Sequence, residues 1–184
     1  MLGSRAFFSS FITKFEHDES KRSWLDIPDG EWTNRMLGTA KSRKKKDFGL
    51  IGSIGQELGY IIQSEWMRID QVWYIILPKP KGWKRDPWRT EVAIEHENHP
   101  SIGYFEYTLH KLEELAVPLK IAFFYPGDQA EEWLHRAEVI IPKQIKGVLG
   151  GVYLLVFGFL NEEETGHRWE AYEIDTKGTT IALH

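Results

Sequence analysis

The chain has 184 residues, no cysteine and a formal net charge of −4. One domain is therefore expected, disulfides and thiolate zinc sites are excluded, and the chain as a whole has no electrostatic attraction to nucleic acid. The lack of cysteine fits a reducing compartment, so a cytoplasmic protein is expected. The longest apolar run, at residues 147–160, is too short to span a bilayer, and no membrane partner is expected.

The N-terminal quarter is expected to be helical and to pack on a core domain. Residues 1–46 form this segment, and residues 47–184 form the core domain. A turn at residues 26–30 (DIPDG) precedes an expected helix at 31–40. The basic run KSRKKK at residues 41–46 is interpreted either as an exposed linker or as a contact for phosphates.

A helix and a hairpin are expected next. Residues 48–63 carry apolar side chains at helical spacing, which predicts one amphipathic helix. Glu57 falls on the apolar stripe of this helix and needs a partner, either a nearby basic side chain or a functional site. Strands are predicted at residues 68–76 and 90–98, joined by a long loop at 77–89 and paired as an antiparallel hairpin.

The second half of the chain completes an α/β pattern. A helix at residues 101–116, with Ser101 as its N-cap, precedes a buried strand at 119–125 between two prolines. Because this helix crosses between two strands, the strands at 90–98 and 119–125 are expected to be parallel. The remaining predicted elements are a helix at residues 128–141 and strands at 152–160, 168–175 and 179–183. The predicted fold is a central mixed β-sheet flanked by helices.

Carboxylates in the predicted hairpin are the best candidates for chemistry. Glu95 and Glu97 lie two residues apart on a mostly apolar strand and so project from the same face. Their repulsion, about 3 kcal/mol at a separation of ~5 Å and an effective dielectric of ~20, would be relieved by a divalent cation. The hairpin brings Asp70, at the start of the first strand, near these two acids. Such oxygen ligands suit Mg²⁺.

Two neighbouring residues have alternative interpretations. Asp86, in the loop, is a rival for Asp70, which is preferred because a strand holds a side chain more rigidly than a proline-flanked loop. His96 lies between the two acids in the sequence but points to the other face. It is interpreted as a core or hydrogen-bonded histidine rather than a ligand.

Residues 48–125 resemble the PD-(D/E)XK, or restriction-endonuclease-like, nuclease superfamily. The resemblance rests on Asp70, on the strand bearing Glu95-His96-Glu97, and on the helix and apolar strand that follow. The resemblance implies an αβββαβ core that hydrolyses phosphodiester bonds of DNA with Mg²⁺, for which Mn²⁺ can substitute. It implies Asp70 and Glu95 as metal ligands, with Glu97 at the third motif position. Glu57, on the preceding helix, is implied as an auxiliary ligand.

The chain departs from this family at the third motif position, where lysine is usual and Glu97 stands here. Some members are similar in having Glu there, and others carry the lysine on the next helix, where Lys111 would match it. Helical spacing, however, puts Lys111 beside the apolar stripe and not on it, which favours a solvated side chain. Some members have lost activity, so the alternative function is an inactive nuclease-fold domain that binds nucleic acid or protein. Many members act as homodimers, although no segment of this sequence marks an interface.

The loop at residues 77–89 (LPKPKGWKRDPWR) is the main local support for a DNA partner. Its basic side chains can bind phosphates and its indoles can stack on bases, and it is expected to lie near the acids. The alternative is a solvated loop whose Trp residues pack on the core. The nucleic-acid contacts expected here are Lys79, Lys81, Trp83, Lys84, Arg85, Trp88 and Arg89.

Overall fold

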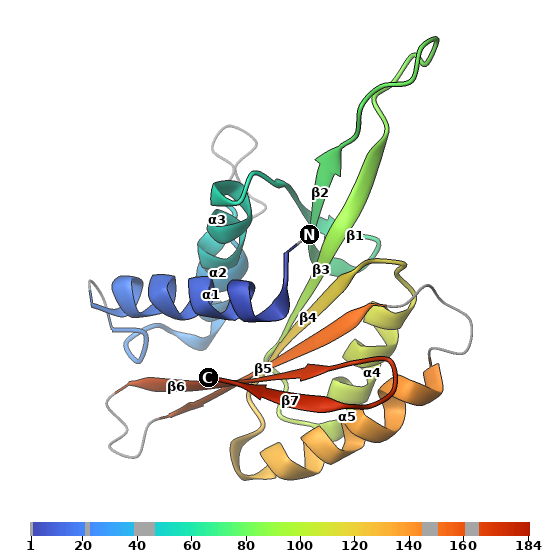
Figure 1. Ribbon diagram of the computed structural model, residues 1–184. Helices are drawn as coiled ribbons and strands as arrows, with labels where there is room; N and C mark the ends of the chain where they lie inside the picture. The colour runs from blue at the N-terminus through green and yellow to red at the C-terminus, as the bar shows by residue number, and fades with distance from the viewer. Residues whose placement is uncertain (1, 21–22, 39–46, 145–150, 161–165) are drawn as a thin grey trace.

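The computed structural model describes residues 2–20, 23–38, 47–144, 151–160 and 166–184. It shows an α/β protein in which a single open, mixed sheet of seven strands separates two helical layers (Figure 1). The fold class predicted from the sequence is therefore confirmed at this level. The basic run at residues 41–46 lies outside the described residues.

The seven strands lie across the sheet in the order of the chain. The first three strands form an antiparallel meander, and the fourth and fifth run parallel to the third. The sixth strand is antiparallel to the fifth, and the seventh is antiparallel to the sixth. The predicted hairpin and the predicted parallel crossover are both confirmed. The strands are β1 (Ile61–Trp66), β2 (Ile69–Ile76), β3 (Trp88–Glu97), β4 (Leu119–Phe124), β5 (Val152–Leu160), β6 (His167–Ile174) and β7 (Thr180–Leu183).

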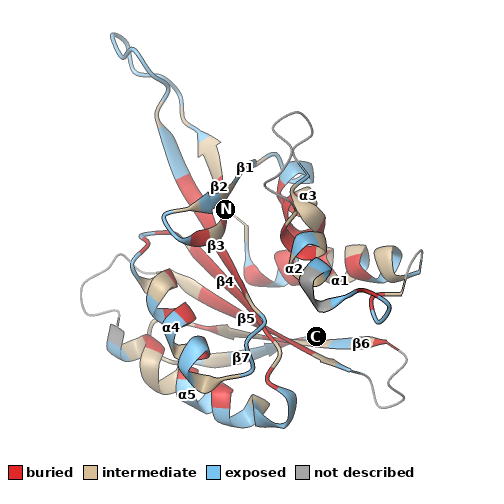
Figure 2. Cartoon of the chain, turned by 180° about the vertical axis from the view of Figure 1, so that it is seen from behind, coloured by how far each residue is buried: buried red, intermediate tan, exposed pale blue. Residues whose placement is uncertain are grey.

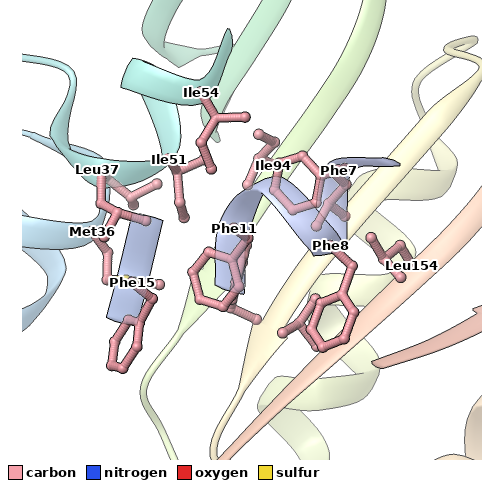
Figure 3. Packing of buried hydrophobic residues seen from close by; sticks show 14 of the residues in the cluster. Phe7, Phe8, Phe11, Phe15, Met36, Leu37, Ile51, Ile54, Ile94 and Leu154 are labelled. Carbon is pink, nitrogen blue, oxygen red and sulfur yellow. The ribbon is translucent and has the colours of Figure 1, made fainter. Parts of the chain in front are cut away.

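Three helices from the N-terminal part of the chain cover one face of the sheet: α1 (Ser4–Glu19), α2 (Asp29–Leu37) and α3 (Gly49–Glu57) (Figure 1). The phenylalanines of α1 recur at helical spacing and enter the same apolar cluster as the strands (Figure 3). The ring centroid of Phe11, for example, lies 5.0 Å from that of Phe123 in β4. Aromatic packing thus joins the N-terminal helices to the sheet.

The other face is covered by α4 (Ile102–Glu113) and α5 (Ala130–Gln144), with a short 3₁₀ helix, η1 (Gly127–Gln129), before α5. Alternate residues of the central strands belong to two apolar clusters, one on each face of the sheet. Ile94 and Phe123 face the N-terminal helices, whereas Ala93 and Phe124 belong to the cluster beneath α4 and α5. The central strands are therefore buried on both faces, as their colouring in Figure 2 shows.

The prediction of one helix over residues 48–63 is wrong in its second half. Helix α3 ends at Glu57, and Gly59 follows with φ of 83°, a left-handed conformation that ends the helix and that glycine adopts without strain. The chain then enters β1, in which Ile62 is buried between exposed neighbours. The apolar residues assigned to the helix therefore belong to two elements. No helix in the described part of the chain is long and apolar enough to cross a membrane.

Candidate functional site

Asp70 and Glu95 lie side by side where β2 begins and β3 ends. Because the two strands are antiparallel, with Gln71 paired to Ile94, these positions are directly across from each other. The backbone N–H of Asp70 donates to Glu95 Oε1 at 3.3 Å, and the N–H of His96 donates to Asp70 Oδ2 at 2.8 Å. Each carboxylate is therefore held by an amide of the opposite strand, which fixes its position.

Lys111 completes this group from helix α4. Ser101 caps the helix, as predicted, by accepting a hydrogen bond from the N–H of Gly103 at 3.3 Å. Lys111 lies in the last turn of the helix, and its Nζ is 2.6 Å from Glu95 Oε2. The Lys111 side chain is 19% exposed and that of Glu95 is 4% exposed. The interpretation of Lys111 as a solvated side chain is therefore wrong, because the helix aims it at the acids.

The site holds more negative charge than Lys111 neutralises. Burial, and then the neighbouring charge of Asp70, raise the pKa of Glu95 to about 7 despite the ion pair with Lys111. Burial likewise raises the pKa of Asp70, an effect opposed by the amide of His96 and by Lys111. Two desolvated carboxylates sharing one lysine form an environment that favours an added cation.

Glu97 lies at the edge of this group and not inside it. It is half-buried at the end of β3, and its Oε1 accepts a hydrogen bond from the N–H of His99 at 2.8 Å. Its charge contributes to raising the pKa of Asp70. Glu97 is thus close enough to act on the site electrostatically while keeping contact with solvent.

Glu57 lies outside the site, contrary to the role that the family resemblance implies. Its side chain is 67% exposed at the end of α3 and pairs with Lys14 of α1 at 2.5 Å. Among the described residues, no hydrogen bond or ion pair joins it to Asp70 or Glu95. Glu57 is the last residue of α3, where the helix leaves the core, and the alternative interpretation, pairing with a basic neighbour, is what the structure shows.

The other two residues considered from the sequence have structural partners. His96 is buried on the opposite face, where Nε2 lies 2.8 Å from the hydroxyl of Tyr125, and burial lowers its pKa to about 3. Asp86 lies 3.7 Å from Lys79 in the exposed loop. The interpretation of His96 as a core histidine is confirmed by this geometry.

One acid near the site was missed from the sequence. Continuing the β1–β2 register past Ser64 and Gln71 places Glu65 opposite Asp70, and its charge contributes to raising the Asp70 pKa. Its backbone has φ of 53°, which is rare for a residue with a side chain. The false helical prediction over residues 48–63 concealed β1. Gly59, a residue type that commonly follows the end of a helix, was the signal available in the sequence.

The sequence predicted that the basic loop lies near the acids, and this prediction is wrong. The same hairpin that joins Asp70 to Glu95 at its open end places residues 77–87 at its closed end. Asp70 and Ile76 are six residues apart on β2, which corresponds to about 20 Å. Any contact of this loop with a substrate is therefore remote from Asp70 and Glu95.

The donor set fits a cation that retains water molecules. Among the described residues, no three Asp, Glu, His or Cys side chains converge closely enough to form a protein cage for a metal. Two carboxylates, Asp70 and Glu95, do converge, and Mg²⁺ is commonly held by one or two carboxylates with water and phosphate oxygens. The residues present therefore fit Mg²⁺ better than they fit Zn²⁺ or Ca²⁺.

A separate cavity of about 900 Å³ lies towards the carboxyl ends of β4 and β5. Its walls include Trp24 and Trp32 from the N-terminal part of the chain and Tyr125 after β4. Neither Asp70 nor Glu95 lines it. The acidic group and this cavity are thus distinct features.

Comparisons with protein-family models and with curated proteins supply no function. A scan against protein-family models found no match, and no curated protein matched the sequence at a significant level. The residues and their geometry therefore provide the evidence for function.

Proposed function

We propose that this protein is a Mg²⁺-dependent nuclease of the restriction-endonuclease-like type that hydrolyses phosphodiester bonds of DNA. The observation that carries the proposal is the buried group of Asp70, Glu95 and Lys111, built from two antiparallel strands and the crossover helix. The run of elements α3, β1, β2, β3, α4 and β4 agrees with the αβββαβ order that the family resemblance implies.

Each residue has a role that follows from its position. Asp70 and Glu95 would hold the Mg²⁺, since their carboxylates converge and are oriented by backbone amides. When bound, the cation supplies Lewis-acid stabilisation of the charge that develops on the phosphodiester. Lys111 places a positive charge beside the same phosphate, taking the part of the lysine absent from the third motif position. Glu97, which keeps contact with solvent, orients the attacking water and accepts its proton.

An inactive domain of the same fold that binds nucleic acid or protein is the second candidate. One observation favours it: Lys111 Nζ lies 2.6 Å from Glu95 and already neutralises part of the charge that would bind the cation. A domain that uses the lysine only to stabilise its buried acids would not cleave DNA.

Nicking of supercoiled plasmid with Mg²⁺ or Mn²⁺ tests the proposal. Asp70→Asn and Glu95→Gln preserve side-chain shape and should each reduce cleavage by at least about 100-fold, because they remove a ligand charge. Glu57→Gln is the matched control, since Glu57 is an exposed acid paired with Lys14, and it should cleave like the wild type. Unchanged cleavage by Glu95→Gln would overturn the site, and binding of DNA with no cleavage by the wild type would favour the inactive domain.

A further inference from the structure

We propose that residues 75–89, the closed end of the β2–β3 hairpin, form an arm that binds double-stranded DNA several base pairs away from the acidic site. The inference rests on the proposed function and adds to it the form of the substrate. It assigns the arm to affinity for DNA and not to the chemical step.

The arm is an ordered ribbon that stands out from the body of the protein (Figure 1). None of its residues is buried, and its surface is exposed over most of its length (Figure 2). Ile76 pairs with Trp88, and the N–H of Leu77 donates to the carbonyl of Pro87 at 2.8 Å. Three prolines further restrict its backbone. A two-stranded ribbon of this kind has dimensions that the major groove of B-DNA accommodates.

The charge of the arm is positive and only partly neutralised. It carries five basic residues and one acid in a chain whose net charge is −4. Lys79 pairs with Asp86 at 3.7 Å, and Arg89 at the base of the arm pairs with Glu91 of β3 at 2.5 Å. The other three basic residues pair with no carboxylate in the described part of the chain; they are Lys81, Lys84 and Arg85. Such a concentration of unpaired cations complements a polyphosphate backbone.

The two tryptophans of the arm have different surroundings. Trp88 packs against Trp66 and Tyr74, with ring centroids 6.1 and 5.7 Å away, and so stiffens the base of the arm. Trp83 is 58% exposed between the unpaired cations and makes no ring contact within the described residues. An indole placed in this way can pack on sugars or on the edges of bases while neighbouring cations bind phosphates.

The hairpin fixes how far this contact lies from the acids. The Ile76–Trp88 pair, where the arm leaves the sheet, lies six residues and about 20 Å along β2 from Asp70. Since B-DNA rises about 3.4 Å per base pair, a duplex running along the hairpin reaches the arm about six base pairs from the bond at the acidic site. Substrates with fewer than about six base pairs on that side should gain nothing from the arm, whereas longer duplexes should bind more tightly.

The test neutralises the unpaired cations in the full-length protein. The variant K81Q/K84Q/R85Q is compared with R5Q/K143Q/K177Q, which removes the same charge from exposed positions elsewhere. Binding of a fluorescent duplex of about 30 base pairs is followed by anisotropy at several salt concentrations, in EDTA to prevent cleavage. The arm variant should bind at least about 10-fold more weakly at low salt, and its log–log salt slope should fall by about three. The control variant should resemble the wild type.

Three outcomes would overturn the proposal that the arm binds DNA. The first is an unchanged affinity and salt slope for the arm variant, and the second is an equal loss of affinity in the control variant. The third comes from a parallel measurement with phosphatidylglycerol vesicles, in which the arm variant loses binding to the vesicles but retains binding to the duplex. If the wild type cleaves DNA and the arm variant binds and cleaves equally well, DNA binding by the arm is refuted and the nuclease proposal is retained. If none of the proteins cleaves DNA but the arm variant alone loses duplex binding, the nuclease proposal is refuted and DNA binding by the arm is retained. If both hold, the arm variant raises KM for long duplexes and leaves kcat unchanged.

Discussion

Glu95→Gln should stabilise the protein at neutral and alkaline pH, because the wild type buries a carboxylate that prefers to be protonated. The pKa of Glu95 lies at about 7 in the folded protein, against an ordinary value of 4.5. This difference corresponds to about 3 kcal/mol. The raised pKa means that the protonated form contributes stability below pH 4.5, and that this contribution is lost as the pH rises through about 7.

Glutamine reproduces the shape of the protonated acid and can still accept hydrogen bonds from Asp70 and Lys111. Urea unfolding without divalent cations should therefore give similar free energies for the two proteins near pH 4.5, and a variant more stable by about 3 kcal/mol near pH 8. Glu97→Gln, two residues along and more exposed, is the matched control and should change the free energy by less than about 0.5 kcal/mol. A Glu95→Gln variant that is no more stable than the wild type near pH 8 would refute the reasoning.

Two further predictions concern the packing that supports the site. Phe11→Ala should lower the free energy of unfolding by about 3–5 kcal/mol in a single urea transition, because Phe11 is fully buried between α1 and the sheet; a separate early transition would show that the N-terminal helices unfold independently. Tyr125→Phe should cost about 1–3 kcal/mol, because its hydroxyl accepts from Trp32 Nε1 at 2.6 Å and contacts His96 Nε2 at 2.8 Å; an unchanged urea midpoint would mean that neither hydrogen bond contributes to stability.

The sequence predicted the parts of the fold that local patterns control. The strand carrying Glu95 was recognisable from β-branched residues, and the crossover through α4 made the parallel pairing with β4 predictable. The boundary after α3 was missed because two apolar residues of β1 continue the helical spacing by chance. Residues 58–60 separate the two elements, and Gly59 among them has a left-handed φ.

The site was predictable in the same measure. The proximity of Asp70 and Glu95 follows directly from hairpin pairing, so two strand positions were enough to find it. The pairing of Lys111 with Glu95 depends on how far α4 is rotated over the sheet, which spacing within one helix does not determine. The error about the basic loop was one of geometry, since a hairpin that joins the acids must carry its loop to the other end.

Calorimetric titration with Mn²⁺ near pH 8 tests the central claim most directly, because it measures the cation at the acids independently of any substrate. We expect a binding isotherm for the wild type and for Glu57→Gln, and its loss in Asp70→Asn and in Glu95→Gln. A wild type that binds no Mn²⁺, or an Asp70→Asn variant that binds it as tightly as the wild type, would contradict the account.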